Sequence, residues 1–412
     1  MRSFWKRLAG LLVGTAISPA ICLASVIIQY NQLVFPPGLD QTLKFRLCQT
    51  WIMSGILLGV VLEELGLSNL PEIMRLCTNG IPAWRGDPSL VIWNEEFDGV
   101  PVRIYSPKTV STAKRKAVLY FHGGSGIMGS YDTFERFLRY LAKEGNAMVV
   151  TVGYGLAPES PYPSQHVECL KVATFLIKHA DDYGVDSSRI ILSGDSFGGT
   201  LATHVCQVLT DRSDLPKIHA QALIYPALQG LDLSLPSYQQ NRRSPLLWPK
   251  LVAFLGCRYL DKPTSLADGL LKGSHVPKAT RQKYQKWVSA DHIPERFKAR
   301  GYVAPEPSSF QFDPRLHEEM KVVLTDNFSP LLAEDTVIAK LPQTFLLTCE
   351  FDVLRDDGLL YLRRLMDNRV PVTWSHVENG VHGISVCYGY CFLSFSSANR
   401  IAHELASFVR NL

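Results

Sequence analysis

The pentapeptide Gly194-Asp195-Ser196-Phe197-Gly198 constrains this chain more than any other feature. The residues before it, 189–193, predict a short buried strand, and residues 198–205 predict the start of a helix. Glycines on both sides of the serine let the backbone turn sharply, which exposes the serine hydroxyl. The sequence therefore predicts a strand–turn–helix unit that presents Ser196 as a nucleophile.

A second glycine-rich turn, His122-Gly123-Gly124, follows the apolar residues 117–121, which predict another strand. In chains that carry the serine turn, such a loop supplies backbone N–H groups to the oxyanion that forms during acyl transfer. Each donor stabilises the transition state by roughly 2.7–4 kcal/mol. A turn that merely needs small residues is the alternative. Two motifs in the right order, each at the end of a strand, favour the catalytic interpretation.

A serine hydroxyl needs a base, and that base needs an acid to orient it. In chains with this turn the acid follows the serine, and the histidine comes last. Residues 343–349 predict a strand, which is followed by four carboxylates, Glu350, Asp352, Asp356 and Asp357. Asp352 lies just past the strand end, where a loop can direct it toward the serine. We expect Asp356 and Asp357 to cap or begin a helix over 358–365.

Histidine is common, with eleven in the chain, but only three follow Asp352. His376 falls within the strand predicted for 370–376, and His403 falls within the C-terminal helix. His382 lies in the loop predicted for 378–383, after the last strand. A loop there can reach over to the serine, so His382 is the predicted base.

Several short stretches of the chain occur together in one group of proteins: 122–124, 154–159, 194–199, 329–333, 352–356 and 382–383. Together they resemble the arylacetamide deacetylase-like family of hormone-sensitive-lipase-type serine esterases, over essentially the whole chain. The resemblance implies a microsomal hydrolase of carboxylic esters or arylamides that needs no cofactor. It names Ser196 as nucleophile, Asp352 as acid and His382 as base, with His122 as motif support. It also implies that the oxyanion hole is formed by the N–H groups of Gly123, Gly124 and Phe197.

The chain departs from that family at three positions. Ser125 stands where a third glycine is common, and a serine can serve only if its φ is accessible. Gly155 replaces the arginine usual before Leu-Ala-Pro-Glu, so whatever that arginine anchors is missing. Ile127 stands where some relatives have a cysteine that pairs with the position of Cys349, so that disulfide is not expected.

Composition narrows the class of protein. With 412 residues, 46% hydrophobic and 19% charged, the chain fits a globular enzyme that carries a membrane segment. A formal charge of +4 and the lack of basic runs interleaved with aromatics argue against nucleic acid as a partner. Neither Cys-x-x-Cys nor His-Glu-x-x-His occurs, so we expect no metal. The expected partner is a small lipophilic ester or amide substrate.

The N-terminus predicts a membrane anchor. Residues 8–28 carry no charge, and about 20 such residues cross a bilayer. Arg2, Lys6 and Arg7 precede them, so we expect a single-pass type II protein with a lumenal catalytic part, in the endoplasmic reticulum. A cleaved signal peptide is the alternative. A second apolar run, 47–62, predicts a buried or interfacial helix that covers the active site rather than another crossing. Asn327-Phe328-Ser329 is a glycosylation sequon, weakened by Pro330.

The predicted fold class is α/β, an α/β-hydrolase fold with a mostly parallel sheet, a helical cap and an N-terminal transmembrane helix. The predicted parts are an anchor at 1–30, membrane-proximal helices at 31–88, and a catalytic domain at 89–412 with a cap inserted at about 227–327. The catalytic domain opens with a hairpin over 89–93 and 100–105, and strands at 117–121, 147–152, 190–192 and 220–225 alternate with helices.

Basic residues outnumber acidic ones over 242–300. This stretch is either a solvated helical surface or a cap that rests near lipid head groups.

The leading hypothesis is a membrane-anchored serine hydrolase of lipophilic esters or arylamides that works through an acyl-enzyme. Two alternatives stay open. One is a hydrolase-fold protein that has lost catalysis and serves in binding, for which the departures at Ser125 and Gly155 leave room. The other is a lipase of longer-chain or sterol esters.

Overall fold

The computed structural model describes residues 2–79, 86–108, 113–306, 310–390 and 393–412. Within these ranges the strands form one eight-stranded sheet in the order β1-β2-β4-β3-β5-β6-β7-β8. The strands are β1 (Leu90–Phe97), β2 (Val100–Pro107), β3 (Arg115–Phe121), β4 (Met148–Val152), β5 (Val185–Asp195), β6 (Ala220–Ile224), β7 (Gln343–Phe351) and β8 (Val372–Val381). β2 pairs antiparallel with β1 and β4, and every other pairing is parallel. The predicted α/β class, edge hairpin and mostly parallel sheet are confirmed.

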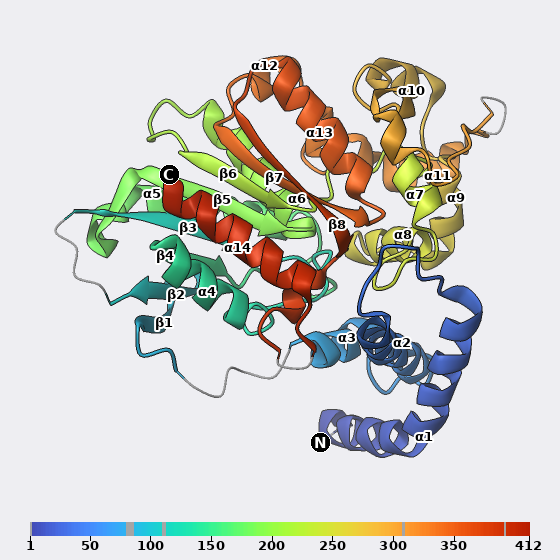
Figure 1. The fold of residues 1–412 in the computed structure, drawn as a ribbon. Helices are drawn as coiled ribbons and strands as arrows, with labels where there is room; N and C mark the ends of the chain where they lie inside the picture. Colours follow the sequence, from blue (N-terminus) through green and yellow to red (C-terminus); the bar gives the residue numbers. More distant parts are fainter. Residues whose placement is uncertain (1, 80–85, 109–112, 307–309, 391–392) are drawn as a thin grey trace.

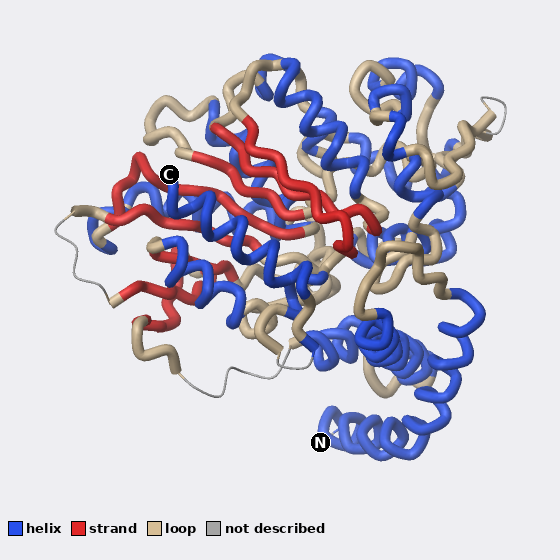
Figure 2. Tube along the Cα trace, in the orientation of Figure 1, coloured by secondary structure: helices blue, strands red, loops and turns tan. Residues whose placement is uncertain are grey.

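Helices cover both faces of the sheet, as parallel strands require (Figures 1 and 2). The central strands β4 and β6 are buried along their whole length. One face packs against α4 (Glu135–Gly145) and α14 (Ser396–Asn411). The other face packs against α5 (Ser164–Lys178), α6 (Phe197–Thr210) and α13 (Arg355–Asp367). In α14 the buried residues recur every three or four positions, which is the stripe of an amphipathic helix.

The segment between β6 and β7 departs from strand–helix alternation. It folds into short helices, α7 (Pro236–Gln240), α8 (Pro249–Tyr259), α9 (Ala267–Leu271), α10 (Lys278–Tyr284), α11 (Pro314–Met320) and α12 (Asp335–Ile338). Proline at the first turn of α7, α8 and α11 suits a helix start, because the missing N–H has no partner there in any case. This interval includes the predicted cap at about 227–327, and the division into domains stays a prediction.

Three helices precede the sheet: α1 (Arg2–Gln32), α2 (Thr42–Glu64) and α3 (Leu70–Thr78). The stretch Val13–Asn31 of α1 and the whole of α2 are long and apolar enough to cross a membrane, a test that buried core helices and signal sequences also pass. The second apolar run is thus a 23-residue helix, longer than the predicted 47–62. α1 contains Pro19 and is bent (Figure 1). The Ser54 hydroxyl donates to Ser25 Oγ over 3.0 Å, which joins α1 to α2.

Candidate active site

Ser196 lies between the end of β5 and the start of α6, as predicted. Its backbone has φ 54 and ψ −122, a conformation that a non-glycine residue keeps only when its surroundings enforce it. A Cβ on Gly198 would lie 1.9 Å from the carbonyl oxygen of Phe121, and one on Gly194 would lie 2.2 Å from the carbonyl oxygen of Gly198. The two glycines therefore allow the close approach that holds the serine in its turn.

The structure brings the three predicted catalytic residues together. His382 Nε2 lies 2.8 Å from Ser196 Oγ, and His382 Nδ1 lies 2.9 Å from Asp352 Oδ2. The other carboxylate oxygen of Asp352 accepts the N–H of Leu354 over 2.8 Å. Asp352 and His382 are buried. In this arrangement the imidazole can accept the serine proton while the carboxylate holds the opposite ring nitrogen.

The last strand is longer than expected, which sharpens the placement of His382. We expected a loop over 378–383, but β8 continues to Val381 and His382 follows it directly. The histidine is therefore aimed by the end of a paired strand. His376 lies within β8, as predicted, and its Nε2 lies 3.1 Å from a carboxylate oxygen of Glu350.

The remaining carboxylates near Asp352 have structural partners. β7 extends through Phe351, so Glu350 belongs to the strand. Asp356 and Asp357 lie in the first turn of α13, as predicted, but they bind elsewhere: Asp356 accepts the N–H of Ser237 and Asp357 accepts the N–H of Leu228. Burial raises the pKa of Asp357 to about 7. These two aspartates thus fasten the segment that follows β6 to the base of α13.

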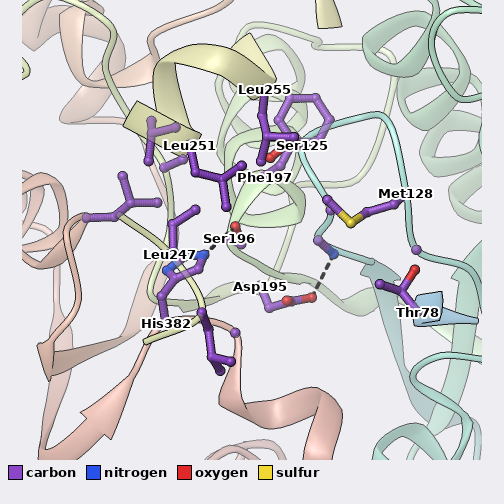
Figure 3. A pocket seen from close by; sticks show the side chains of 18 of the residues that line it. Thr78, Ser125, Met128, Asp195, Ser196, Phe197, Leu247, Leu251, Leu255 and His382 are labelled. Atoms are coloured by element: carbon purple, nitrogen blue, oxygen red, sulfur yellow. Dashed lines mark hydrogen bonds between the residues drawn. The ribbon is translucent and has the colours of Figure 1, made fainter. Parts of the chain in front are cut away.

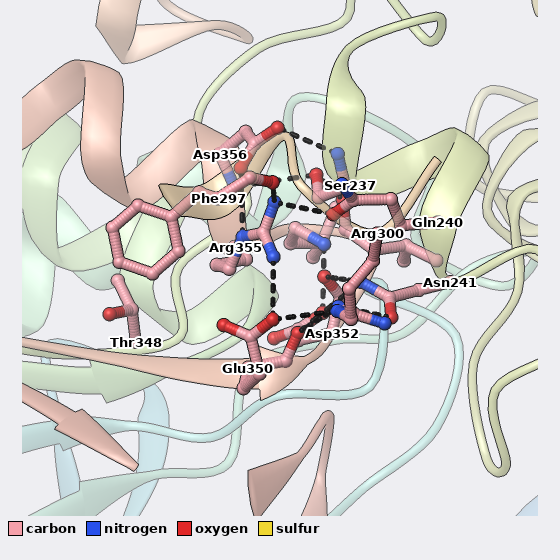
Figure 4. Close-up of polar contacts among 12 residues, drawn as sticks. Ser237, Gln240, Asn241, Phe297, Arg300, Thr348, Glu350, Asp352, Arg355 and Asp356 are labelled. Atoms are coloured by element: carbon pink, nitrogen blue, oxygen red, sulfur yellow. Dashed lines mark hydrogen bonds and ion pairs between the residues drawn. The ribbon is translucent and has the colours of Figure 1, made fainter. Parts of the chain in front are cut away.

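A buried polar network surrounds the turn that carries Asp352 (Figure 4). The Asn241 amide donates to the carbonyl oxygen of Asp352 over 2.8 Å, and the Arg300 guanidinium donates to Asn241 Oδ1 over 3.1 Å. Arg300 and Arg355 both donate to Glu350 Oε1, over 2.8 and 3.1 Å. Asn241 and Arg300 come from the segment between β6 and β7, so that segment supports the turn of the predicted acid. Sequence reasoning missed both residues, because they lie 111 and 50 positions from their partners.

The geometry corrects the prediction for Gly123. Its N–H donates to Asp195 Oδ1 over 2.8 Å and is therefore not free for an oxyanion. Among the described residues, the N–H groups of Gly124, Ser125 and Phe197 have no hydrogen-bond partner, and all three residues line the same cavity as Ser196. Ser125 has φ 57, so the serine does adopt the left-handed conformation that a glycine would take more easily.

Asp195 and His122 shape the loop that follows β3. Asp195 Oδ1 accepts the Tyr120 hydroxyl over 2.8 Å as well as the Gly123 N–H, and burial raises the Asp195 pKa to about 6. His122 is buried, stacks on Tyr154 at 4.3 Å, and has its Nδ1 2.8 Å from the carbonyl oxygen of Gly123. Burial lowers the His122 pKa to about 4, so the ring is neutral near pH 7. It supports the loop as an uncharged hydrogen-bond donor.

A cavity of about 660 Å³ lies over the serine (Figure 3). Figure 3 shows Leu247, Leu251 and Leu255, from α8 and the loop before it, on one side of Ser196, and Met128 on the other. Leu47, Trp51 and Ile52 of α2 also line the cavity, so α2 borders the candidate active site, as predicted for the second apolar run. Because a charged group would lose its hydration among these side chains, the cavity suits uncharged, apolar molecules.

Position 155 has no room for an arginine, and Arg75 of α3 binds the loops beside it. A Cβ on Gly155 would lie 2.4 Å from Ser160 Oγ, so this backbone has no room for a side chain there. The Arg75 guanidinium instead donates to the carbonyl oxygens of Ile127 (2.7 Å) and Ala157 (2.6 Å), and it pairs with Glu159 at 2.8 Å. α3 thereby ties the loop after β3, whose Met128 lines the cavity, to the loop that carries Ala157 and Glu159.

Two further predicted positions have a clear environment. Cys349 is buried and, like the other described cysteines, is not in a disulfide. Asn327 is exposed, but the hydroxyl of Ser329 in the same sequon is buried and donates to the carbonyl oxygen of Val323 over 2.6 Å. Glycosylation stays a prediction. In the part of the chain that the structure describes, no group of three or more histidine, cysteine or acidic side chains is arranged to hold a metal.

Proteins with similar sequences include arylacetamide deacetylases, and solved structures with a similar fold include esterases. A profile of the family described as "alpha/beta hydrolase fold" matches residues 118–279 and 307–386. Arylacetamide deacetylase-like 3 of Homo sapiens is 40% identical over 370 residues, which are 89% of this chain and 88% of that protein. Arylacetamide deacetylase of Bos taurus is 32% identical over 394 residues, with 93% and 97% covered. A thermostable esterase from Pseudomonas putida ECU1011 shares the fold, with a TM-score of 0.62 at 21% identity over 92% of this chain and 98% of the esterase.

Proposed function

The chain belongs to the arylacetamide deacetylase-like family of α/β hydrolases, and we propose that it hydrolyses uncharged, lipophilic carboxylic esters or arylamides through an acyl-enzyme on Ser196. It is a serine ester hydrolase by that membership. One observation carries the proposal: His382 forms hydrogen bonds of 2.8 Å to Ser196 and 2.9 Å to Asp352 at the same time.

In the proposed reaction Ser196 Oγ attacks the acyl carbon while His382 Nε2 takes the hydroxyl proton. His382 then donates that proton to the departing alcohol or amine as its bond to the acyl carbon breaks. A water molecule then attacks the acyl carbon while the same imidazole takes its proton. The bond between the acyl carbon and Ser196 Oγ breaks, the acid leaves, and His382 returns the proton to Ser196 Oγ. Asp352 orients the ring and stabilises the imidazolium that forms in each step.

The proposed oxyanion donors are the N–H groups of Gly124, Ser125 and Phe197. Each of these N–H groups is free within the described structure, and each of the three residues lines the cavity, which supports the assignment. The Gly123 N–H has a different role, because its hydrogen bond to Asp195 anchors the loop that carries Gly124 and Ser125. Pre-positioned donors of this kind each stabilise the developing charge by roughly 2.7–4 kcal/mol.

The N-terminal helix α1 is proposed as the membrane anchor, with a cytosolic N-terminus and the catalytic part in the lumen of the endoplasmic reticulum. The apolar stretch Val13–Asn31 supports an anchor by its length and composition. Protease protection of intact microsomes tests the orientation: the catalytic part should survive until detergent is added. Digestion of the catalytic part in sealed vesicles would contradict the lumenal orientation.

Hydrolysis of a short-chain nitrophenyl ester tests the catalytic proposal. Ser196→Ala should reduce kcat by at least 10³-fold, whereas Ser188→Ala, at an exposed position near the start of β5, should leave it unchanged. Folded wild-type protein without activity on any ester would favour the binding-protein alternative. A graded series of acyl chains distinguishes an esterase from a lipase, since a lipase prefers the longer chains.

A further inference from the structure

The mouth of the cavity lies on the outer side of α2. Leu47 and Trp51 line the cavity, yet 50% and 62% of their surfaces are exposed to solvent. Trp51 is fixed by a 2.9 Å hydrogen bond from its Nε1 to the carbonyl oxygen of Cys77 in α3, another residue of the lining. Side chains that face both the cavity and the surface mark the place where the two meet.

The surface around this mouth is apolar. Leu43, Leu47 and Trp51 follow one another at four-residue spacing, so they form one stripe along α2, and Leu43 is 70% exposed. Leu76 of α3, next to Cys77, is 72% exposed. We call these four residues the portal face. Apolar side chains gathered on a surface mark a site of contact with a partner or a membrane.

Basic and aromatic side chains gather where α1 ends, beside the N-terminal half of α2. Tyr30, near the C-terminal end of α1, is 82% exposed. Arg46, Arg242 and Arg243 are exposed. The N–H of Val34 donates to the carbonyl oxygen of Arg243 over 3.2 Å, and the Arg46 guanidinium lies 4.7 Å from the ring of Phe35, which places both arginines beside the end of α1. Tyrosine and arginine at the end of an apolar helix match the interface between a bilayer and water, where such side chains reach the head groups.

Most of the other basic residues of the segment between β6 and β7 have acidic partners. Lys262 pairs with Glu319, Lys298 with Glu295, and Arg258 with Glu63 of α2. The idea that the whole basic stretch rests on lipid is therefore not supported, and we carry forward only Arg242 and Arg243, which lie close to the end of α1.

We propose that the portal face sits in one leaflet of a membrane, and that the substrate is an uncharged ester lipid that enters the cavity from the bilayer beside α2. This inference rests on the proposed esterase activity and adds that the substrate reaches the site from the lipid bilayer rather than from water. α2 has the length and mean hydropathy of a helix that can lie in a membrane, its inner side carries the buried Phe45, Gln49 and Met53, and its outer stripe leads directly to the serine cavity.

Two substrates and two double variants of the full chain test the proposal. The portal variant is Leu43→Glu with Leu76→Glu, at positions that do not line the cavity. The control variant is Val167→Glu with Met366→Glu, which makes the same change at exposed residues of α5 and α13. Each protein is reconstituted in vesicles of phosphatidylcholine with about one fifth phosphatidylserine. Its rate is measured on a soluble nitrophenyl butyrate and on a long-chain fluorogenic ester dissolved in the same vesicles.

The portal variant should keep the rate on the soluble ester within twofold of the control and lose at least tenfold on the vesicle ester. Equal rates of both variants on the vesicle ester would overturn the proposal. An equal loss on both substrates would also overturn it, because the portal face would then support the site rather than admit substrate. If the wild type hydrolyses neither ester, the esterase proposal fails first, so the two failures are distinguishable.

Fluorescence quenching provides a test that is independent of activity. The emission of Trp51 is obtained as the difference between the wild type and Trp51→Phe. In vesicles whose acyl chains carry bromine, that emission should fall by at least half relative to unbrominated vesicles. Unchanged emission would place Trp51 outside the bilayer and contradict the proposed seating.

Discussion

Asp195→Asn separates the charge of this side chain from its hydrogen bonds. Asp195 Oδ1 accepts both the Gly123 N–H and the Tyr120 hydroxyl, and an asparagine oxygen can accept the same two donors. Burial raises the Asp195 pKa from 3.8 to about 6. The substitution therefore removes an ionisation that folding disfavours while it keeps the loop in place.

The size of the stability difference between the two proteins follows from the linkage between protonation of Asp195 and folding. Because the folded pKa of Asp195 lies above the unfolded one, its contribution to stability is fully present below about pH 4 and is lost as the pH rises through about 6. A shift of about two units corresponds to about 3 kcal/mol. The free energy of unfolding of Asp195→Asn, minus that of the wild type, should therefore increase by about 2–3 kcal/mol between pH 4 and pH 7.5, because at pH 4 the unfolded carboxyl is already partly ionised.

Asp195→Ala is the matched variant that loses the hydrogen bonds as well. It leaves the Gly123 N–H and the Tyr120 hydroxyl buried without partners, at roughly 1–3 kcal/mol each. At a given pH it should be less stable than Asp195→Asn by roughly 2–6 kcal/mol. Its kcat should fall at least 100-fold, since the loop that carries Gly124 and Ser125 loses its anchor, whereas Asp195→Asn should stay within tenfold of the wild type.

Denaturant unfolding of the three proteins at pH 4, 6 and 7.5, in one detergent, measures the differences in stability, and ester hydrolysis at pH 7.5 measures kcat. A difference between Asp195→Asn and the wild type that stays constant across the pH range would refute the raised pKa. Equal kcat for the alanine and asparagine variants would refute the anchoring role.

Three further predictions concern residues that support the site. Arg75→Ala should lower the free energy of unfolding by about 1–3 kcal/mol, because a partly exposed guanidinium loses its bonds to two loops; Arg75→Lys should be intermediate, and denaturant unfolding measures both. Arg300→Ala should lower kcat several-fold with KM unchanged, because Arg300 contacts the turn of Asp352 rather than the cavity; steady-state kinetics with the exposed Arg296→Ala as control decide this. Acid should destabilise the fold from about pH 6.5 toward 4. Burial lowers the pKa of four imidazoles to about 3 or 4, so the unfolded chain binds those protons first, and their stabilising contribution is lost as the pH falls; thermal unfolding at pH 7 and pH 5 measures the loss. The four are His122, His166, His204 and His275. The raised pKa values of Asp195, Asp356 and Asp357 oppose this trend only in part, since three carboxyl groups face four imidazoles.

The sequence predicts the fold and the three central residues because their signals are local. The glycines on both sides of Ser196 indicate its turn, and Asp352 and His382 each follow the end of an apolar strand. The last strand could not be placed as well, because Glu378, Asn379 and Gly380 are typical of loops, yet pairing with β7 keeps residues up to Val381 in the sheet.

The contacts that the sequence does not predict join distant segments. Arg75 lies 52 and 82 residues from the carbonyls it binds, and Asn241 lies 111 residues from Asp352. The prediction that the Gly123 N–H serves the oxyanion is wrong for a related reason. This N–H donates to Asp195, which belongs to the serine motif, and the contact between the two motifs appears only in the folded protein.

The central claim is that Ser196 is the nucleophile activated by His382. A fluorophosphonate reacts covalently with an activated serine, and peptide mass spectrometry locates the adduct. We predict one adduct on the peptide that contains Ser196, at least 100-fold less of it in His382→Ala, and unchanged labelling in His376→Ala, the imidazole that pairs with Glu350 instead. Labelling on another serine, or full labelling of folded His382→Ala, would contradict the account.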